Sequence, residues 1–360
     1  MTKLLEATLE HLCALVSFDT RNPPRAIGTH GIFDYVRTHL PDFDLTLTDH
    51  GTGAVSLLAI RGAPRVLFNV HLDTVPIADG WSADPFALRV AAGRASGLGA
   101  CDIKGAAAAL LAAAAQTHGS AAFLFSTDEE ADDARCIAHF LGTARSLDAA
   151  LIAEPTRGRA VLAHRGYSAV RVQFGGRAGH ASDSDSEALN ANALHQAVRW
   201  SVKALDYMAS QADRRYDNLS GLRFNIGRIE GGIVPNVVAP GAEVQFSFRP
   251  LPFDEPDELL DALRLLAKPA PAAFEETFRG APLPSAAKHD AARSVAASLD
   301  LPVGAAADFW SEAALFSAAG WPAIVYGPGD IAQAHAADEW VALDELSTYA
   351  ENIRRIIDRG

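Results

Sequence analysis

A short apolar run near the middle of the chain is followed by three acidic residues. The run Ala121–Phe125 has the length and composition of a buried strand, and Asp128, Glu129 and Glu130 come soon after it. Neighbouring carboxylates repel one another, and removal from water makes each one costlier to keep charged. A cluster of this kind either binds a cation or lies in water at the end of a strand, and the second case is the more common.

Four other segments place a histidine or a carboxylate beside an apolar run. His71 follows Val66–Val70, Glu154 follows a second such run, Asp102 precedes an alanine-rich segment, and His335 follows a strand-like run and a turn. Ligands of open α/β sheets bind at the carboxyl ends of the strands, so these side chains could converge there. Two imidazoles with several carboxylates suit Zn²⁺ or a similar ion such as Co²⁺ or Mn²⁺. One histidine alone would be weak support for a metal, but the joint pattern favours one.

The elements that must position these residues alternate between strand and helix along the first half of the chain. This alternation predicts an α/β layer with a largely parallel central sheet. The first helix is expected to be amphipathic, because leucines recur at helical spacing near the N-terminus. The expected strands are Asp44–Thr48, Ala54–Ile60, Val66–Val70, Ala121–Phe125 and Ala149–Ala153, and the further helices are Ile32–Leu40, Gly105–Gln116 and Ala134–Leu141.

The pattern changes from about Tyr167, where the expected order becomes β-α-β-β-α-β, as in a ferredoxin-like domain. From about residue 281 the sequence again predicts alternating helices and strands. We therefore expect a discontinuous domain of residues 1–165 and 281–360, interrupted by an inserted domain of residues 166–280. The inserted strands are expected at Ser168–Phe174, Arg223–Ile229, Glu243–Phe248 and Ala273–Phe278, and its helices at Ala188–Met208 and Pro256–Leu266; Ala291–Leu299 and Leu343–Ile357 are expected helices, and Ala323–Tyr326 a strand.

Composition narrows the possible partners and the location. The chain has 360 residues, of which 49% are hydrophobic and 21% charged, as in an ordinary soluble enzyme. Its formal net charge of −13 argues against nucleic acid or an anionic membrane as a partner. Three cysteines without C-x-x-C spacing make a disulfide framework unlikely and fit the cytoplasm. Glu6 and Glu10 in the first helix argue against a signal peptide, and polar residues interrupt the charge-free stretch Gly105–Thr127, so no membrane span is expected.

Other reaction classes lack their motifs. The segment beginning at Gly97 has Asp102 where a dinucleotide-binding fingerprint needs its third glycine. The sequence contains neither the G-x-S-x-G motif of a serine hydrolase nor a P-loop. No sequence feature makes Cys101 a better nucleophile than a small buried residue.

Six segments, in this order, resemble a family of dinuclear metallohydrolases that includes acetylornithine deacetylase, succinyl-diaminopimelate desuccinylase, aminoacylase and glutamate carboxypeptidase. The resemblance extends over nearly the whole chain, and it implies a metallopeptidase-like catalytic domain with an inserted dimerisation domain. The segments are His71-Leu-Asp73, Gly97-x-Gly-x-x-Asp102-Ile-Lys-Gly105, Asp128-Glu129-Glu130, Glu154-Pro-Thr156, Gly179-His180-Ala-Ser182 and Ala334-His335-x-x-Asp338-Glu339.

The resemblance implies two divalent metal ions, Zn or Co, held by five residues. Asp102 would bridge the ions, since the two oxygens of one carboxylate can span such a pair. His71 and Glu154 would complete the protein ligands of one ion, and Glu130 and His335 those of the other. The family also implies a cis peptide bond after the bridging aspartate.

Five further residues receive roles from the resemblance. Glu129 would be the general base, and Asp73 would accept the second ring N–H of the first histidine ligand. The counterpart of His180 supplies an oxyanion donor across a dimer interface, although alone it would be an ordinary loop histidine. Asn236 and Arg249 match residues that bind the substrate carboxylate, although Arg249 could equally be a surface residue.

The implied activity is metal-dependent hydrolysis of the amide of a small-molecule N-acyl amino acid by a cytoplasmic homodimer. Ser17–Pro24, Phe309–Ala313 and Val325–His335 resemble the branch of the family that converts N-acetyl-L-citrulline to citrulline and acetate in arginine biosynthesis. N-acetyl-L-ornithine is the main alternative, because no pattern identifies residues that meet a ureido group rather than an ammonium. A non-catalytic metal-binding homologue is the alternative from another class, and the intact Glu129 counts against it.

Overall fold

The computed structural model describes residues 1–131, 133–143, 147–182, 191–252, 254–270, 272–284 and 289–359. Two units divide the chain between them: unit 1 comprises Met1–Leu162, Ala287–Gly304 and Ser311–Gly360, and unit 2 comprises Ala163–Ala286 and Ala305–Trp310. The predicted boundaries assign residues 305–310 to the first domain, whereas this segment belongs to unit 2. Its Ala307 N–H donates to the carbonyl oxygen of Ala163, and its Asp308 pairs with the buried Arg165 at 2.6 Å.

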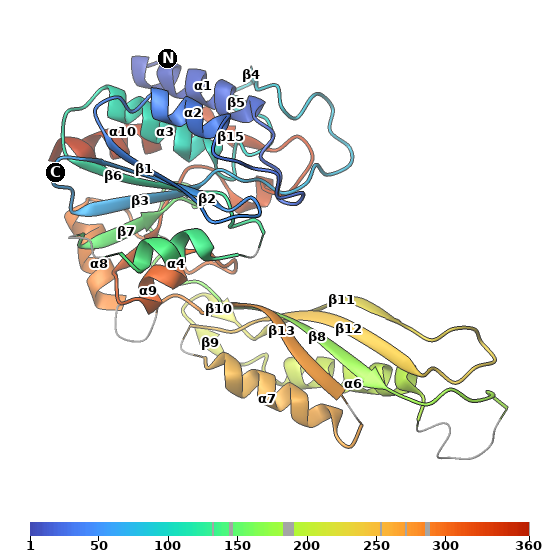
Figure 1. The fold of residues 1–360 in the computed structure, drawn as a ribbon. Coiled ribbons are helices and arrows are strands. Elements are labelled where there is room, and N and C mark those ends of the chain that lie inside the picture. Colours follow the sequence, from blue (N-terminus) through green and yellow to red (C-terminus); the bar gives the residue numbers. More distant parts are fainter. Residues whose placement is uncertain are drawn as a thin grey trace. The chain divides into compact units, whose positions relative to one another are not determined.

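The apolar runs of unit 1 form a six-stranded sheet in the order β1-β2-β6-β3-β7-β14 (Figure 1). Strands β6, β3, β7 and β14 are parallel to one another, whereas β2 pairs antiparallel with both β1 and β6. The predicted α/β class with a largely parallel central sheet is therefore confirmed. The strands are β1 (Asp44–Asp49), β2 (Val55–Arg61), β3 (Val66–His71), β6 (Ala121–Ser126), β7 (Ala149–Ile152) and β14 (Ala323–Val325).

Helices cover both faces of this sheet (Figure 1). Helices α1, α3 and α10 pack together on one face, and α4 and α9 pack together on the other. Helix α8 contacts the edge strand β14 and shares the hydrophobic core of α10. Every residue from Lys104 to Ala114 in α3 is buried, and its many alanines let neighbouring elements approach closely. The helices are α1 (Lys3–Ser17), α2 (Ile32–Thr38), α3 (Lys104–Ala115), α4 (Arg135–Leu141), α8 (His289–Ser298), α9 (Ala313–Ala318) and α10 (Leu343–Arg359).

Several short elements were not expected from the sequence. A three-stranded sheet of order β15-β5-β4 and a two-stranded ribbon β10-β9 contain strands of two or three residues. Such strands are too short for a period of two to become visible. They are β4 (Arg89–Ala91), β5 (Arg94–Ser96), β9 (Arg215–Tyr216), β10 (Leu219–Ser220) and β15 (Trp340–Ala342), and the 3₁₀ turn η1 is Ile331–Gln333.

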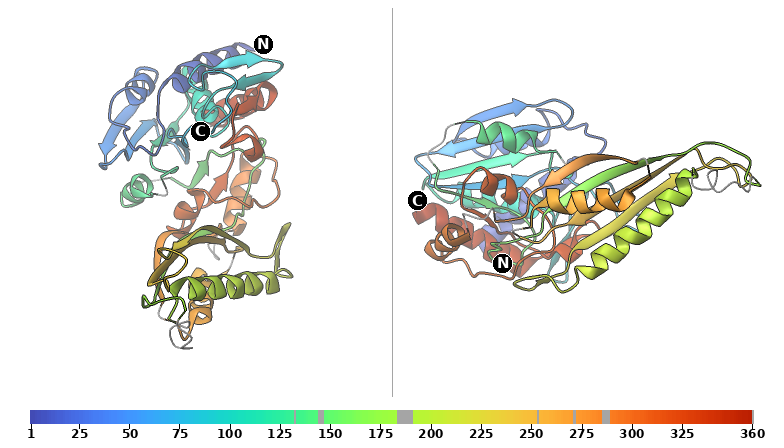
Figure 2. Two further views of the ribbon diagram at one scale, coloured as in Figure 1. Left: turned by 90° about the vertical axis from the view of Figure 1, so that its right-hand side faces the viewer. Right: turned by 90° about the horizontal axis from the view of Figure 1, so that it is seen from below.

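Unit 2 contains the predicted β-α-β-β-α-β order. Its antiparallel sheet has the strand order β11-β12-β8-β13, and α6 and α7 cover one face of it (Figures 1 and 2). Residues 188–190 of the predicted first helix lie outside the described part, and the observed helix begins at Ala193. The elements are β8 (Tyr167–Gly175), α6 (Ala193–Ser210), β11 (Arg223–Gly231), β12 (Gly241–Arg249), α7 (Pro256–Ala267) and β13 (Ala272–Gly280). Of the helices in the described residues, none is both long and apolar enough to cross a membrane.

Candidate metal centre

The first group of candidate ligands lies at the carboxyl end of β3. His71 is the last residue of this strand, and its Nε2 lies 3.1 Å from Asp102 Oδ1 and 3.9 Å from Glu154 Oε1. All three side chains are buried. Glu154 follows β7, the parallel neighbour of β3, so two adjacent strands deliver these residues to one edge of the sheet.

The second group shares Asp102 with the first. His335 Nε2 lies 3.4 Å from Asp102 Oδ2 and 3.2 Å from Glu130 Oε1. Each oxygen of Asp102 therefore faces a different imidazole, which is the arrangement expected of a carboxylate between two cations. The structure thus brings together all five residues proposed as metal ligands from the sequence.

The composition of the cluster fits divalent cations. The donor atoms of His71, Asp102 and Glu154 lie within 4.8 Å of one another, as do those of Asp102, Glu130 and His335. Within the described residues, the buried Glu154 Oε1 has no hydrogen-bond partner. Buried, closely spaced carboxylates need positive charge to remain ionised, and mixed nitrogen and oxygen donors suit zinc-like ions.

Burial and mutual repulsion act on the acidic residues of the cluster. Burial, reinforced by Glu154 and Glu130, raises the pKa of Glu129 well above its usual value. Burial, reinforced by Asp102, does the same to the pKa of Glu154. Hydrogen bonds to Asp102 and Glu130 raise the pKa of His335 to about 10. Without a cation this cluster therefore retains protons, and a bound metal would have to displace those on the imidazoles.

The position of Glu129 leaves its role open. It forms a third group with His71 and Glu130 whose donor atoms also lie within 4.8 Å of one another. Distance alone therefore does not separate a general base from a ligand. The different roles of Glu129 and Glu130 stay a prediction.

Asp73 connects the two halves of the cluster. The Nδ1 atom of His71 lies 3.1 Å from the carbonyl oxygen of Asp73 and 3.5 Å from its carboxylate. Asp73 Oδ2 accepts hydrogen bonds from Asn22 Nδ2 and from the backbone N–H of Glu130. This residue thus faces one proposed ligand while it holds the loop of another, a combination that the sequence did not indicate.

Glu339 holds the loop that carries Asp102. Its buried carboxylate accepts hydrogen bonds from the backbone N–H groups of Gly99, Cys101 and Asp102, at 3.0, 2.8 and 2.9 Å. The peptide bond between Asp102 and Ile103 is cis, as the resemblance implied. Glu339 follows His335 by four positions, so one segment supplies a candidate ligand and the support of another.

Glu312 is a buried acid for which the sequence suggested no role. Its Oε2 lies 2.5 Å from Asn69 Nδ2 and 3.5 Å from Ser126 Oγ. Asn69 is on β3 and Ser126 ends β6, so this side chain connects the strands that lead to the metal cluster. Burial, reinforced by Asp128, raises the pKa of Glu312 to about 8. Only the folded chain reveals this contact, because Glu312 and Asn69 are 243 positions apart.

The three remaining candidate residues belong to unit 2. His180 is exposed, and its Nδ1 lies 2.6 Å from Ser182 Oγ. The carbonyl oxygen of Asn236 accepts the backbone N–H of Ala181, which places Asn236 beside the histidine loop. Arg249 ends β12, and its guanidinium lies 4.7 Å from the centre of the Tyr167 ring. The roles proposed for these residues stay predictions.

Comparison with known proteins identifies the class. Residues 67–359 match the model of peptidase family M20/M25/M40. The chain therefore belongs to this family of metal-dependent hydrolases, which confirms the predicted resemblance.

Among the relatives, the N-acetyl-L-citrulline deacetylase of Xanthomonas campestris pv. campestris is 60% identical over 365 residues, and 99% of each chain is covered. The acetylornithine deacetylase of Myxococcus xanthus is 29% identical, with 96% of this chain and 95% of that protein covered. Among solved structures, aminopeptidase PepT from Bacillus cereus superposes with a TM-score of 0.73 at 18% identity, with 98% of both chains covered. A dinuclear metal-binding M20 peptidase from Bacillus subtilis has a TM-score of 0.70 at 14% identity, with 99% of this chain and 98% of that chain covered.

Proposed function

We propose that this protein removes the acetyl group of N-acetyl-L-citrulline by metal-dependent amide hydrolysis, giving citrulline and acetate in arginine biosynthesis. The observation that carries the hydrolytic part is the position of Asp102, whose two oxygens face two imidazoles. The choice of substrate is supported by 60% identity to a protein named for this activity.

Two divalent ions, Zn or Co, would be held by the five ligand candidates. His71, Asp102 and Glu154 would hold one, and Asp102, Glu130 and His335 the other. Bound ions of this kind lower the pKa of water and polarise an amide carbonyl. Mixed imidazole and carboxylate donors support zinc-like ions, and they do not select between zinc and cobalt.

Glu129 is the proposed general base, which takes a proton from water and delivers it to the leaving amine. Its burial and its acidic neighbours raise its pKa, so a proton is held on this carboxyl more readily than on an exposed one. Asp73 would orient His71 and hold the Glu130 loop through its two sets of contacts. Asn236 and Arg249 would bind the substrate carboxylate, and His180 would donate to the oxyanion.

A cytoplasmic homodimer completes the proposal, with His180 acting across the interface. Three exposed apolar side chains of α6 support an interface in unit 2: Val198, Val202 and Leu205 are 50%, 53% and 51% exposed. Their spacing of four and three residues places them on one face of the helix. Exposed apolar stripes of this kind mark interaction surfaces.

The decisive experiment compares kcat/KM for N-acetyl-L-citrulline and N-acetyl-L-ornithine on cobalt-loaded protein. A clear preference for the citrulline substrate is expected. A preference for the ornithine substrate would instead favour acetylornithine deacetylation, the activity in the names of relatives at 28% and 29% identity. A metal-loaded protein that hydrolyses no N-acyl amino acid would indicate a non-catalytic homologue.

A further inference from the structure

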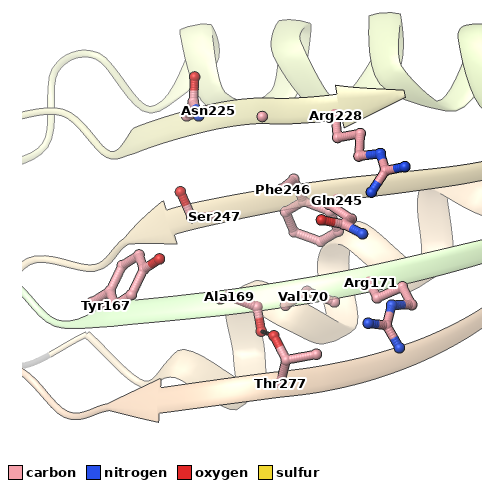
Figure 3. Close-up of a pocket in the computed structure, with 11 residues that line it drawn as sticks. Tyr167, Ala169, Val170, Arg171, Asn225, Arg228, Gln245, Phe246, Ser247 and Thr277 are labelled. Atoms are coloured by element: carbon pink, nitrogen blue, oxygen red, sulfur yellow. Dashed lines mark hydrogen bonds between the residues drawn. The ribbon is translucent and has the colours of Figure 1, made fainter. Parts of the chain in front are cut away.

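A row of short side chains crosses the sheet of unit 2 on the face opposite its helices. Asn225 on β11 pairs with Ser247 on β12, and Ser247 pairs with Ala169 on β8. The β11 strand is irregular between Ile226 and Arg228. Figure 3 shows the short side chains side by side on successive strands.

Longer side chains stand on both sides of this row. On one side the next row contains Arg228, Gln245 and Arg171, which pair across the same three strands. On the other side, Arg249 follows Ser247 by two residues and stacks on Tyr167. The short row therefore forms the floor of a trough, a cavity of about 500 Å³ in unit 2 (Figure 3).

The trough is polar and lacks a carboxylate. Its lining includes Arg171 and Arg228 and contains no Asp or Glu among the described residues. The acidic partners of these arginines lie outside the lining: Arg171 pairs with Glu243 and Glu275, and Arg228 pairs with Glu230. Within the described part of the chain, the side chains of Asn225 and Ser247 make no hydrogen bond, so an amide and a hydroxyl remain available to a ligand.

We propose that the trough receives the uncharged ureido end of the substrate side chain, with Asn225 and Ser247 as the residues that determine specificity. A ureido group offers one carbonyl acceptor and several N–H donors. The Asn225 amide can donate and accept, and the Ser247 hydroxyl can do both as well. An ammonium offers donors only, and in this trough it would meet two guanidiniums and no carboxylate. The lining therefore favours the neutral side chain over the charged one.

The dimensions of the sheet agree with this placement. This inference rests on the proposed function, in which Arg249 binds the substrate carboxylate. Two residues that are two positions apart on a strand lie about 7 Å apart along it. Arg249 and Ser247 are two positions apart on β12, so about 7 Å separates Arg249 from the row of short side chains. Six bonds of about 1.5 Å separate the carboxylate and ureido carbons of citrulline and span roughly 7 Å when extended. A carboxylate on Arg249 would thus place the ureido group over Asn225 and Ser247.

The test measures kcat/KM for N-acetylcitrulline and N-acetylornithine with the full-length, cobalt-loaded protein and its Asn225→Asp variant. A carboxylate in the trough should lower the ratio of kcat/KM for N-acetylcitrulline to kcat/KM for N-acetylornithine at least about tenfold. The expected reason is that the new carboxylate can hydrogen-bond the ammonium, and the free energy of a hydrogen bond to a charged group corresponds to a factor of about that size. Ser247→Ala should lower kcat/KM for N-acetylcitrulline several-fold. It should leave kcat/KM for N-acetylmethionine unchanged, because that substrate has no ureido group. Gln173→Glu is the matched control, since it adds a carboxylate to exposed β8 outside the lining, and its ratio should stay at the wild-type value.

The possible failures are distinguishable. A wild-type protein that hydrolyses neither substrate would overturn the proposed function and this inference with it. A wild-type protein that prefers N-acetylcitrulline while Asn225→Asp and Ser247→Ala keep the wild-type ratios would overturn the inference alone. A change of the kcat/KM ratio in the Gln173→Glu control equal to that in Asn225→Asp would also overturn the inference, because the change would then depend on the net charge of the protein and not on the position of the carboxylate.

Discussion

Each carboxylate near the metal cluster has a different set of neighbours, and its chemistry depends on them. Asp102 lies between two imidazoles, Glu130 faces one, and Glu339 accepts three backbone N–H groups. Glu129 is buried among other acids. Four acids of similar intrinsic strength can therefore serve as bridge, ligand, loop support and base.

The first prediction separates the two adjacent glutamates. Glu129→Gln should keep its bound metal and lose activity by at least about a hundredfold, because general base catalysis contributes that much. Glu130→Gln should instead weaken metal binding, because it removes a charged donor that faces His335. Metal content after dialysis and kcat on the same samples would check both. Equal metal loss in the two variants would contradict the separate roles.

A second prediction concerns acid stability and His11 on α1. Burial, reinforced by His39, lowers the pKa of His11 to about 4, against about 6.5 in an unfolded chain. The unfolded state therefore binds more protons between these values, so the contribution to stability is complete above pH 6.5 and is lost as pH falls towards 4.

The His11→Gln variant has no titratable group at this position, so its stability should not show this pH dependence. Relative to the variant, the wild-type protein should lose on the order of 1 kcal/mol of unfolding free energy between pH 7.5 and 4.5, because solvent screens this half-buried ring and reduces the full effect of the shift. Urea unfolding of both proteins at a series of pH values would measure the difference. Parallel curves for the two proteins would show that His11 does not titrate in this way.

Among the elements, α3 and the loop before it determine where Asp102 lies. Gly105 lies in the first turn of this buried helix, and a Cβ added there would come within 2.5 Å of the carbonyl oxygen of Ala100. Glycine in a helix normally costs about 0.5–1 kcal/mol relative to alanine. The close approach of the loop backbone reverses that preference here.

The third prediction follows from this close approach. Gly105→Ala should lower the unfolding free energy by about 1–2 kcal/mol, since overpacking outweighs the gain in helix propensity, and it should weaken metal binding by displacing the loop. Gly142→Ala is the matched control, because its added Cβ would meet no atom closer than 3.4 Å at the end of α4. Thermal unfolding and metal titration of both variants would check this. A Gly105→Ala protein at least as stable as the wild type would contradict it.

Element length decides how much of the fold could be predicted from the sequence. Buried strands such as β6 and amphipathic helices such as α10 are long enough to show their period, so they were predicted to within a few residues. The strands of the β15-β5-β4 sheet and the short α9 carry too few residues to do so. The same limit applies to the site: motifs indicated the ligands, whereas the contact between Glu312 and Asn69 depends on tertiary packing.

At the scale of the whole molecule, the α6 helix presents two different apolar faces. Ala197, Trp200 and Ala204 are buried in the core of unit 2, whereas Val202 and Leu205 are exposed. The chain carries a formal net charge of −13, which disfavours association unless a local surface drives it. The exposed stripe supplies such a surface, and the proposed homodimer would bury it twice about a symmetry axis.

The fourth prediction places a charge in this stripe. Val202→Glu should convert the protein to a monomer of 38.1 kDa in light scattering, whereas the wild type should have twice that mass. Ser210→Glu is the matched control, since it adds the same charge near the exposed end of the helix outside the stripe, and it should remain dimeric. A dimeric Val202→Glu protein would show that the interface lies elsewhere.

The final prediction tests whether His180 acts across that interface. A His180→Ala protein and a Glu129→Gln protein should each be nearly inactive. In a mixed dimer, the subunit with intact Glu129 would receive His180 from its partner, so one of its two sites would work. Random exchange makes half of the dimers mixed, so the mixture should reach about a quarter of wild-type activity.

The same mixing experiment distinguishes a His180 that acts in the partner's site from one that acts in the site of its own subunit. If His180 acts within its own subunit, every site in the mixture lacks one of the two groups and no activity returns. Subunit exchange should be demonstrated independently by mass-labelled subunits, so that lack of recovery can be interpreted. Adding Val202→Glu to both proteins should abolish the recovery, because subunits that no longer pair cannot share a histidine.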